Sequence, residues 1–458
     1  MIENANNFNK IAVWDEDAAR HILARTLFGY NKQDIEFALS HSLDDFVDNF
    51  LLADQPVPPE PAYWVNDPTN ENNTERTREL IYWWYNLMHT QGYSLRERMV
   101  LFWHNHFVSE VSKVGLAQHM YWQNKLFRDF AMGNLIDFTK AVTINPAMLL
   151  YLDGTRNRKG APNENYAREL MELFTLGIGN YTEQDIQEAA RSLTGWRLNE
   201  LTSYFDASRF DDGSKTILGQ TGNFIHNDVV DIIFTQPAAA TLFCRELYNE
   251  FMHVAHDDPS IATMAQILRN NNYDIKPVLS TLLKSVMFHT SEVRGAKIKS
   301  PVELMIGAMR QFNVATPDYV YMRAVAAQLK QELFAPPNVS GWDGDKIWIN
   351  TTTLPSRNVF TDAVMNGKKP GGGDLTFQLN LVEYARTFPS AEDAVQLIDE
   401  ISKIFLQYPL SENRKEYLLN TLLDGAEVYD WSTADPQAEN RLKMFFKALM
   451  RLSEYQLS

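Results

Sequence analysis

The sequence predicts a mostly α-helical protein: one large, bundle-like domain with long irregular loops and little or no sheet. Three observations lead to this prediction. Apolar residues recur at helical spacing through most of the chain. Capping residues precede many of these segments, and glycine ends several of them. Strand and helix patterns do not alternate, as they would around a parallel sheet.

Helical segments fill the first part of the chain. A helix over residues 17–27 ends where Gly29 interrupts the pattern, and four prolines between residues 56 and 61 make a stiff, non-helical connector. Ser94 and Glu97 have the spacing of a capping box, so a helix is expected to begin there. The strongest pattern ends at Gly177. The helices predicted in this part cover residues 17–27, 32–38, 43–51, 74–89, 94–106, 119–132, 135–142 and 163–176.

The second part of the chain begins with a change of character. Thr182, with Asp185 three residues later, marks the start of a helix that runs to Gly195. Residues 197–224 then lose the helical period, which indicates a long loop or a small hairpin laid over the helices. Such loops are often functional. Residues 333–350 are also irregular. Further helices are predicted over residues 227–234, 237–254, 259–270, 275–287, 301–312, 320–331, 354–365, 391–405, 413–423 and 438–453.

The length of the chain, 458 residues, is compatible with one large domain or with two. The run from Lys368 to Gly373 is the clearest linker or loop tip because it combines proline with three glycines. We therefore predict a main helical domain over residues 1–366, a linker or loop over 367–373, and a C-terminal helical block over 374–458 that packs on the main domain.

Composition and charge restrict the partners. The net charge of −16 argues against nucleic acid, which needs clustered Lys and Arg. No apolar run is long enough to span a bilayer. The single cysteine, Cys244, lies among apolar neighbours and is expected to be a buried thiol. The N-terminus lacks the features of a signal peptide, so we expect a soluble cytoplasmic protein, although a trimmed exported protein would fit as well.

The helix predicted over residues 163–176 carries one polar face. At about 100° per residue, five polar side chains fall on that face: Glu164, Asn165, Arg168, Glu169 and Glu172. One interpretation is a solvated face in which Glu164 and Arg168 form an ion pair. The other is a buried face that lines a cleft, where Glu169 and Glu172 ligate a divalent metal ion or act as an acid–base pair. No histidine lies on this helix, so the Glu-x-x-His signature of di-iron bundles is missing.

A second group of candidates lies in the helix over residues 94–106. His104 and His106 point to nearly opposite sides of a helix, which argues against joint chelation of a metal ion. Glu97 and His104 are two turns apart on one side, so His104 can be a general base or a metal ligand oriented by a carboxylate. His106 is expected to be a core histidine bonded to a backbone carbonyl.

Several short strings, in this order, resemble the bacterial family called domain of unknown function 1800. They are HILAR at residues 21–25 with Phe28-Gly29, FWHNHF at 102–107, NENYARELMEL at 163–173, LTGW at 193–196, KSPVE at 299–303, PPNVSGW at 336–342 and WIN at 348–350. The resemblance implies a mostly helical bacterial protein with no agreed activity. It also implies that members are often exported and encoded beside a family similar to alkaline phosphatases and sulfatases.

The resemblance adds three candidate residues and leaves two differences. His21 and Arg25 occur in one of the strings, and a packing role in which Arg25 caps a carbonyl is the alternative. Trp342 belongs to a loop that either closes over a pocket or holds two helices. The chain shows no export signal, and it has Phe210-Asp211 where members usually carry a His-Asp pair.

Two hypotheses of function follow. The first is an enzyme with a polar cleft between helices and metal-assisted or general acid–base chemistry, with Glu97, His104, Arg168, Glu169 and Glu172 as its catalytic residues. Its metal ligands would be His104, Glu169 and Glu172, and its substrate an unknown small molecule. The alternative is a non-catalytic scaffold or binding module for a partner protein, such as the phosphatase-like neighbour. Motifs of serine hydrolases, of P-loop and dinucleotide-binding proteins and of zinc proteases are missing from the sequence.

Overall fold

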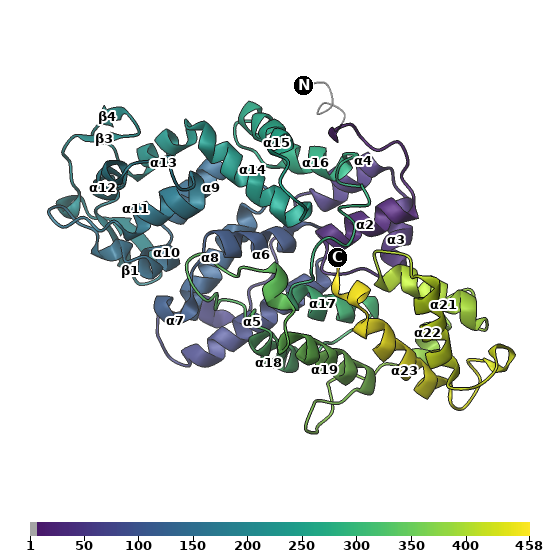
Figure 1. Ribbon diagram of the computed structural model, residues 1–458. Coiled ribbons are helices and arrows are strands. Elements are labelled where there is room, and N and C mark those ends of the chain that lie inside the picture. The colour runs from purple at the N-terminus through teal and green to yellow at the C-terminus, as the bar shows by residue number, and fades with distance from the viewer. Residues whose placement is uncertain (1–6) are drawn as a thin grey trace.

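The computed structural model describes residues 7–458. In that part of the chain the protein is mostly helical, with two small two-stranded sheets. Figure 1 shows the two hairpins at one end of the molecule, the C-terminal helices α21 to α23 at the other, and α6 drawn near the middle. The predicted fold class is therefore confirmed.

The first half of the chain forms helices close to the predicted ones. Their bounds are α2 Glu16–Thr26, α3 Lys32–Leu39, α4 Leu43–Phe46 with the π-helix η1 Val47–Leu51, η2 Tyr63–Asn66, α5 Asn73–Thr90, α6 Arg96–His106, α7 Val111–Val114, α8 Ala117–Asp129, α9 Leu135–Thr143, α10 Pro146–Tyr151, η3 Gly154–Arg156, α11 Asn165–Glu169 with the π-helix η4 Leu170–Thr175, and α12 Glu183–Ser192.

The irregular segment predicted at 197–224 contains two antiparallel hairpins. They are β1 Trp196–Asn199 with β2 Thr202–Phe205, and β3 Lys215–Ile217 with β4 Gln220–Gly222, separated by η5 Ala207–Arg209. The remaining helices are α13 His226–Phe234, α14 Pro237–Phe251, α15 Asp258–Asn270, α16 Lys276–Lys284, α17 Pro301–Gln311, α18 Tyr319–Gln328, η6 Asp345–Trp348, α19 Thr353–Asn366, α20 Leu381–Ala385, α21 Ala394–Phe405, α22 Glu412–Leu423, η7 Val428–Asp430, α23 Ala438–Arg451 and η8 Ser453–Gln456.

Aromatic side chains hold α6 against its neighbours. Trp103 of α6 and Phe107, which directly follows α6, are fully buried and pack edge-on against Phe138 of α9, with ring centroids 5.2 Å and 5.1 Å away. Phe127 of α8 joins the same cluster, 5.6 Å from Phe138. Burying rings of this size stabilises the fold by more than their area alone, because edge-on pairs add electrostatic attraction. The result is a rigidly held α6.

Local capping explains where several helices begin. The capping box predicted at Thr182 and Asp185 forms at the start of α12. The one expected at Ser94 forms only in part: Ser94 Oγ accepts a hydrogen bond from Arg96 N at 3.1 Å, but the Glu97 carboxylate binds other partners. The spacing of Ser94 and Glu97 fits a capping box, but the Glu97 carboxylate pairs instead with the buried guanidinium group of Arg128.

The C-terminal block lies against the main helical body. Tyr455 Oη donates to Gln311 Oε1 of α17 at 3.0 Å, and Arg357 Nε donates to Gln456 Oε1 at 2.7 Å. These contacts agree with packing of the block on the body, while the division into two domains stays a prediction. The single cysteine, Cys244, is buried as expected, and burial raises the pKa of its thiol to about 12. Within residues 7–458, every helix is too short or too polar to cross a membrane.

Candidate functional site

Four charged side chains form a buried ion-pair network where α6, α14 and α17 approach one another. The side chain of Arg98 is 2% exposed; its Nε lies 2.9 Å from Glu250 Oε1, and its Nη2 is paired with Glu303. Lys297 Nζ lies 2.7 Å from Glu250 Oε1 and 3.5 Å from Glu303 Oε1. Two cations thus neutralise two carboxylates, as buried charges require.

The start of α17 explains the position of Glu303. Ser300 Oγ accepts a hydrogen bond from Glu303 N at 3.2 Å, Glu303 Oε2 accepts one from Ser300 N at 2.6 Å, and Pro301 occupies the first turn. Burial alone would raise the pKa of Glu303, but Arg98 and Lys297 hold it well below its usual range. The carboxylate therefore stays ionised at neutral pH, both as a cap and as an ion-pair partner.

The loop after α18 is pinned to α6 and to the end of α14. Trp342 N donates to Asn105 Oδ1 at 2.7 Å, and Asn105 Nδ2 donates to Trp342 O at 3.3 Å. Gly341, with φ +81°, lies so close that an added Cβ would be 2.3 Å from Asn105 Oδ1. On the other side, His253 Nε2 lies 3.6 Å from Asp345 Oδ1. Two separate contacts thus fix this loop next to the ion-pair network.

A cleft of about 340 Å³ lies between the network and the loop. This volume is in the range of small-molecule sites. Aromatic side chains of α6, the loop and η6 form part of its wall: Phe102, Trp342 and Trp348. Among the described lining residues, five carboxylates meet two Lys or Arg side chains, namely Glu246, Glu250, Glu303, Asp343 and Asp345 against Arg98 and Lys297. The cleft therefore has an excess of negative charge.

Glu246 differs from the other buried charges of the cleft. It lies on α14, one turn before Glu250, and within the described part of the chain its carboxylate has no hydrogen bond or ion pair. Burial raises the pKa of Glu246; the charge of Arg245 lowers it and that of Glu250 raises it, and the net shift is upward. Two lining carboxyl groups thus lack a partner among the described residues, Glu246 and Asp343; Asp343 is exposed, whereas Glu246 is half-buried and free to exchange a proton or to receive a ligand.

The structure places Glu97 and His104 in the interior next to α5 and α8. Glu97, 1% exposed, accepts from Arg128 Nε at 2.7 Å, from Arg128 Nη2 at 2.8 Å and from Trp84 Nε1 at 3.1 Å. His104 packs among rings, including those of Trp84 and Trp342, and burial lowers its pKa to about 3. Both residues contact Trp84, so they lie on one side of α6 as predicted, with His104 behind the cleft wall.

His106 behaves as predicted for a core histidine. Its Nε2 lies 2.9 Å from Phe174 O, and burial lowers its pKa to about 4. His21 and Arg25 also contact backbone carbonyls: His21 Nε2 lies 2.8 Å from Phe288 O, and Arg25 donates to Val293 O. Packing roles account for these contacts.

The polar face of the 163–177 segment lies near the surface. Arg168 pairs with Glu164 at 3.2 Å and with Glu183 at 2.8 Å, so the predicted i,i+4 pair is confirmed. Glu172 accepts a hydrogen bond from Tyr181 at 2.8 Å. Burial and the neighbouring Glu172 raise the pKa of Glu169. These side chains are half-buried and Asn165 is exposed, which favours the solvated-face interpretation.

The metal prediction for His104, Glu169 and Glu172 finds no support. Across residues 7–458, no three or more His, Cys, Asp or Glu side chains are grouped so that they could hold a metal ion. His104 is surrounded by aromatic rings, whereas Glu172 is bound by Tyr181 at the surface.

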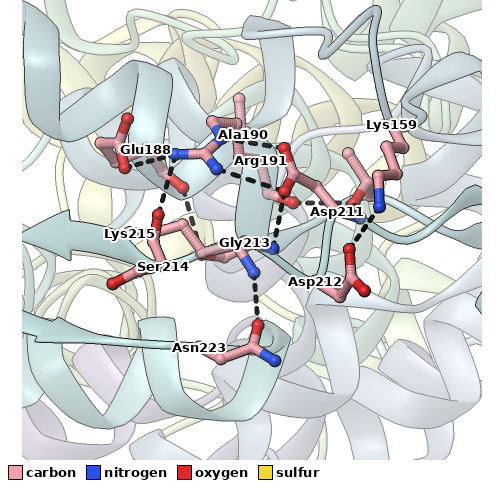
Figure 2. Close-up of polar contacts among 12 residues, drawn as sticks. Lys159, Glu188, Ala190, Arg191, Asp211, Asp212, Gly213, Ser214, Lys215 and Asn223 are labelled. Atoms are coloured by element: carbon pink, nitrogen blue, oxygen red, sulfur yellow. Dashed lines mark hydrogen bonds and ion pairs between the residues drawn. The ribbon is translucent and has the colours of Figure 1, made fainter.

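The loop that carries Phe210 and Asp211 forms a separate polar network (Figure 2). Asp211 Oδ2 accepts from Arg191 Nε at 2.8 Å, and Asp211 Oδ1 accepts from Gly213 N at 3.0 Å. Lys215 Nζ donates to Asn223 Oδ1 at 2.9 Å and lies 4.4 Å from the centre of the Phe210 ring. Phe210 therefore covers a buried lysine, and the network ties the second hairpin to α12.

Sequence reasoning missed most of the cleft. Trp342 is the one predicted site residue among its described lining. The quoted strings also contain Asn105, Ser300 and Glu303, but we had not assigned them a role. One available signal was the i,i+4 spacing of Glu246 and Glu250 on a predicted helix, which places two carboxylates on one face.

One of the three comparisons with known proteins found a match. A family model described as "Protein of unknown function (DUF1800)" matches residues 21–457. The chain belongs to this family, and the match extends across the predicted boundary at 367–373. The search of curated proteins and the search of solved structures found no significant match.

Proposed function

We propose that this protein is an enzyme that binds a small organic cation, such as an amine or an amidine, in the cleft between α6, α14 and the loop at 340–348. The observation that carries the proposal is the carboxyl group of Glu246, which has no partner among the described residues. It lies in a cleft where the charges of Arg98, Lys297, Glu250 and Glu303 already neutralise one another. Glu246 would pair with the positive group of the ligand and exchange a proton with it.

The charge and the walls of the cleft support a cationic ligand. Arg98 and Lys297 are occupied by Glu250 and Glu303, so they leave no net positive charge for an anion. Trp342 and Trp348 offer aromatic faces, and such faces attract cations through their quadrupole. An anionic ligand would instead meet the excess of carboxylates.

The position of Glu246 also supports general acid–base chemistry. A carboxyl group with a raised pKa exchanges its proton closer to neutral pH, where both its acid and its base forms are available. The four ion-paired side chains fix the part of the cleft next to Glu246, which lies one turn before Glu250 on α14. A metal ion is not needed for this step.

Benzamidine is the probe for this site, because it combines a flat aromatic ring with a positive amidinium group. We expect benzamidine to bind in calorimetric titration and Glu246→Gln to weaken its binding about tenfold or more, because a charge-assisted hydrogen bond contributes about 1.5–3 kcal/mol. Binding by the natural protein should strengthen as the pH rises through the raised pKa of Glu246, since only the ionised carboxylate pairs with the amidinium group.

Glu172→Gln is the matched control, because Glu172 lies on the polar helix face and receives a hydrogen bond from Tyr181. It should leave the affinity for benzamidine unchanged. Loss of binding in Glu172→Gln but not in Glu246→Gln would move the site to the 163–177 segment and reject the proposal. So would the absence of any binding of benzamidine.

A further inference from the structure

A second cleft of about 350 Å³ lies on another side of α6. Consecutive residues of an α-helix point roughly 100° apart, and Arg98 lines the cleft described above while Arg96 lines the second one. Its described lining comes from α5, α6 and α8, the connector at residues 54–58 and the start of α16. The charges and hydrogen-bond donors of these side chains determine which ligand the cleft would recognise.

Arg128 is held at the floor of this cleft by two contacts. Its Nε and Nη2 donate to Glu97 at 2.7 Å and 2.8 Å, which uses one edge of the guanidinium group. The Arg128 guanidinium also lies 4.9 Å from the centre of the Trp83 ring. Its Nη1 makes one long contact, 3.4 Å to Asn124 O. The guanidinium group is thus fixed in one plane, and Arg128 is among the residues that line the cleft.

Arg96 adds a positive charge that Glu97 does not neutralise. Arg96 Nη1 donates to Gln55 O at 3.0 Å and to Pro56 O at 2.8 Å. Its buried Nε lies 3.5 Å from Glu97 Oε1 and has no hydrogen-bond partner among the described residues. The guanidinium groups of Arg96 and Arg128 therefore share the single carboxylate of Glu97, so these three side chains together carry a charge of +1.

The other charged side chains of this cleft have partners. Lys125 pairs with Asp129 at 2.6 Å, and Lys276 pairs with Asp54 at 2.6 Å. Asp274 Oδ1 accepts a hydrogen bond from the backbone N of Lys276, the first residue of α16, at 3.0 Å. These three carboxylates would repel a dianion such as phosphate but tolerate a monoanion next to Arg96.

Tyr121 supplies an unused donor in the same cleft. It is 3% exposed and lines the cleft, yet its hydroxyl makes no hydrogen bond within residues 7–458. Burial raises the pKa of Tyr121 to about 12, so the hydroxyl keeps its proton at neutral pH. The ring of Tyr121 is therefore buried, while its hydroxyl oxygen is left accessible in the cleft with its proton available to a ligand.

We propose that this second cleft binds the carboxylate group of a small molecule. Tyr121 Oη would donate to one carboxylate oxygen, and the guanidinium groups of Arg96 and Arg128 would supply the positive charge. Glu97 is then a positioning residue, because it fixes Arg128 without facing the ligand. The site is independent of the cation site, since the two clefts share no described lining residue.

Benzoate is the probe for this site. We expect it to bind to the natural protein and to bind about tenfold more weakly to Tyr121→Phe, because one charge-assisted hydrogen bond is lost. Tyr121→Phe should fold normally, since its hydroxyl has no partner in the chain. Tyr166→Phe is the matched control: it removes a buried hydroxyl that donates to Thr143 at 2.9 Å and should not change the affinity.

Equal affinity of benzoate for Tyr121→Phe and the natural protein would overturn this proposal, as would the absence of benzoate binding. Stronger binding of inorganic phosphate than of benzoate would also contradict a carboxylate site. Glu246→Gln should keep its affinity for benzoate, so the failure of one site is distinguishable from the failure of the other.

Discussion

Arg98→Met should lower the free energy of unfolding by about 3–5 kcal/mol, because it leaves buried carboxylates without their main partner. In the natural protein Arg98 pairs with both Glu250 and Glu303, and it is 2% exposed. Methionine fills a similar volume, so the loss would come from charge rather than from a cavity. Urea unfolding followed by tryptophan fluorescence measures the change.

Arg78→Met is the control for this variant. Arg78 pairs with Glu75 at 2.9 Å on the surface of α5, where both side chains are about half exposed. Surface pairs contribute about 0–1 kcal/mol, so this variant should unfold almost like the natural protein. Adding Glu303→Gln to Arg98→Met should recover part of the loss, since it removes one of the unpaired carboxylates. Similar stability of Arg98→Met and Arg78→Met would show that the network does not hold the cleft.

The second large effect is expected for Glu97→Gln. This change removes the buried carboxylate that receives both Arg128 donors, and the new amide N–H group would face them. Breaking a buried pair from one side costs about 3–5 kcal/mol. We therefore expect a large loss of stability, with weaker binding of benzoate in the protein that remains folded, because Arg128 is no longer fixed.

Glu79→Gln is the matched control. Glu79 accepts a hydrogen bond from Trp64 Nε1 at 2.6 Å but has no ion pair among the described residues. Its replacement should cost much less than that of Glu97. If Glu97→Gln kept its stability but lost an enzymatic reaction, Glu97 would be a catalytic residue, as the sequence predicted, rather than a positioning residue.

Helices were predictable because their signals are local. The period of apolar residues located α14 and α17, and the Thr182 capping box predicted the start of α12. The segment at 163–176 was expected to be a single α-helix, yet its second half is the π-helix η4, where Thr175 Oγ1 donates to Leu170 O. A π turn depends on how the segment packs, which a periodic pattern does not contain.

The site was harder to predict because its contacts are long-range. Arg98 and Glu250 are 152 residues apart, so no local spacing relates them. The seven-residue spacing correctly placed Glu97 and His104 on one side of α6. The spacing could not show that this side packs against aromatic rings. It also gave no reason to prefer Arg98 to its neighbour Glu97, although Arg98 lines the first cleft and Glu97 lines neither of the two clefts.

A crystal structure of the protein soaked with benzamidine tests the cation site most directly. We expect the amidinium group in the cleft between α6, α14 and the loop at 340–348, with its nitrogen atoms about 2.7–2.9 Å from the Glu246 carboxylate. The aromatic ring should lie against Trp342 or Trp348. Benzamidine bound elsewhere, or an empty cleft in a crystal saturated with the compound, would contradict the proposed function.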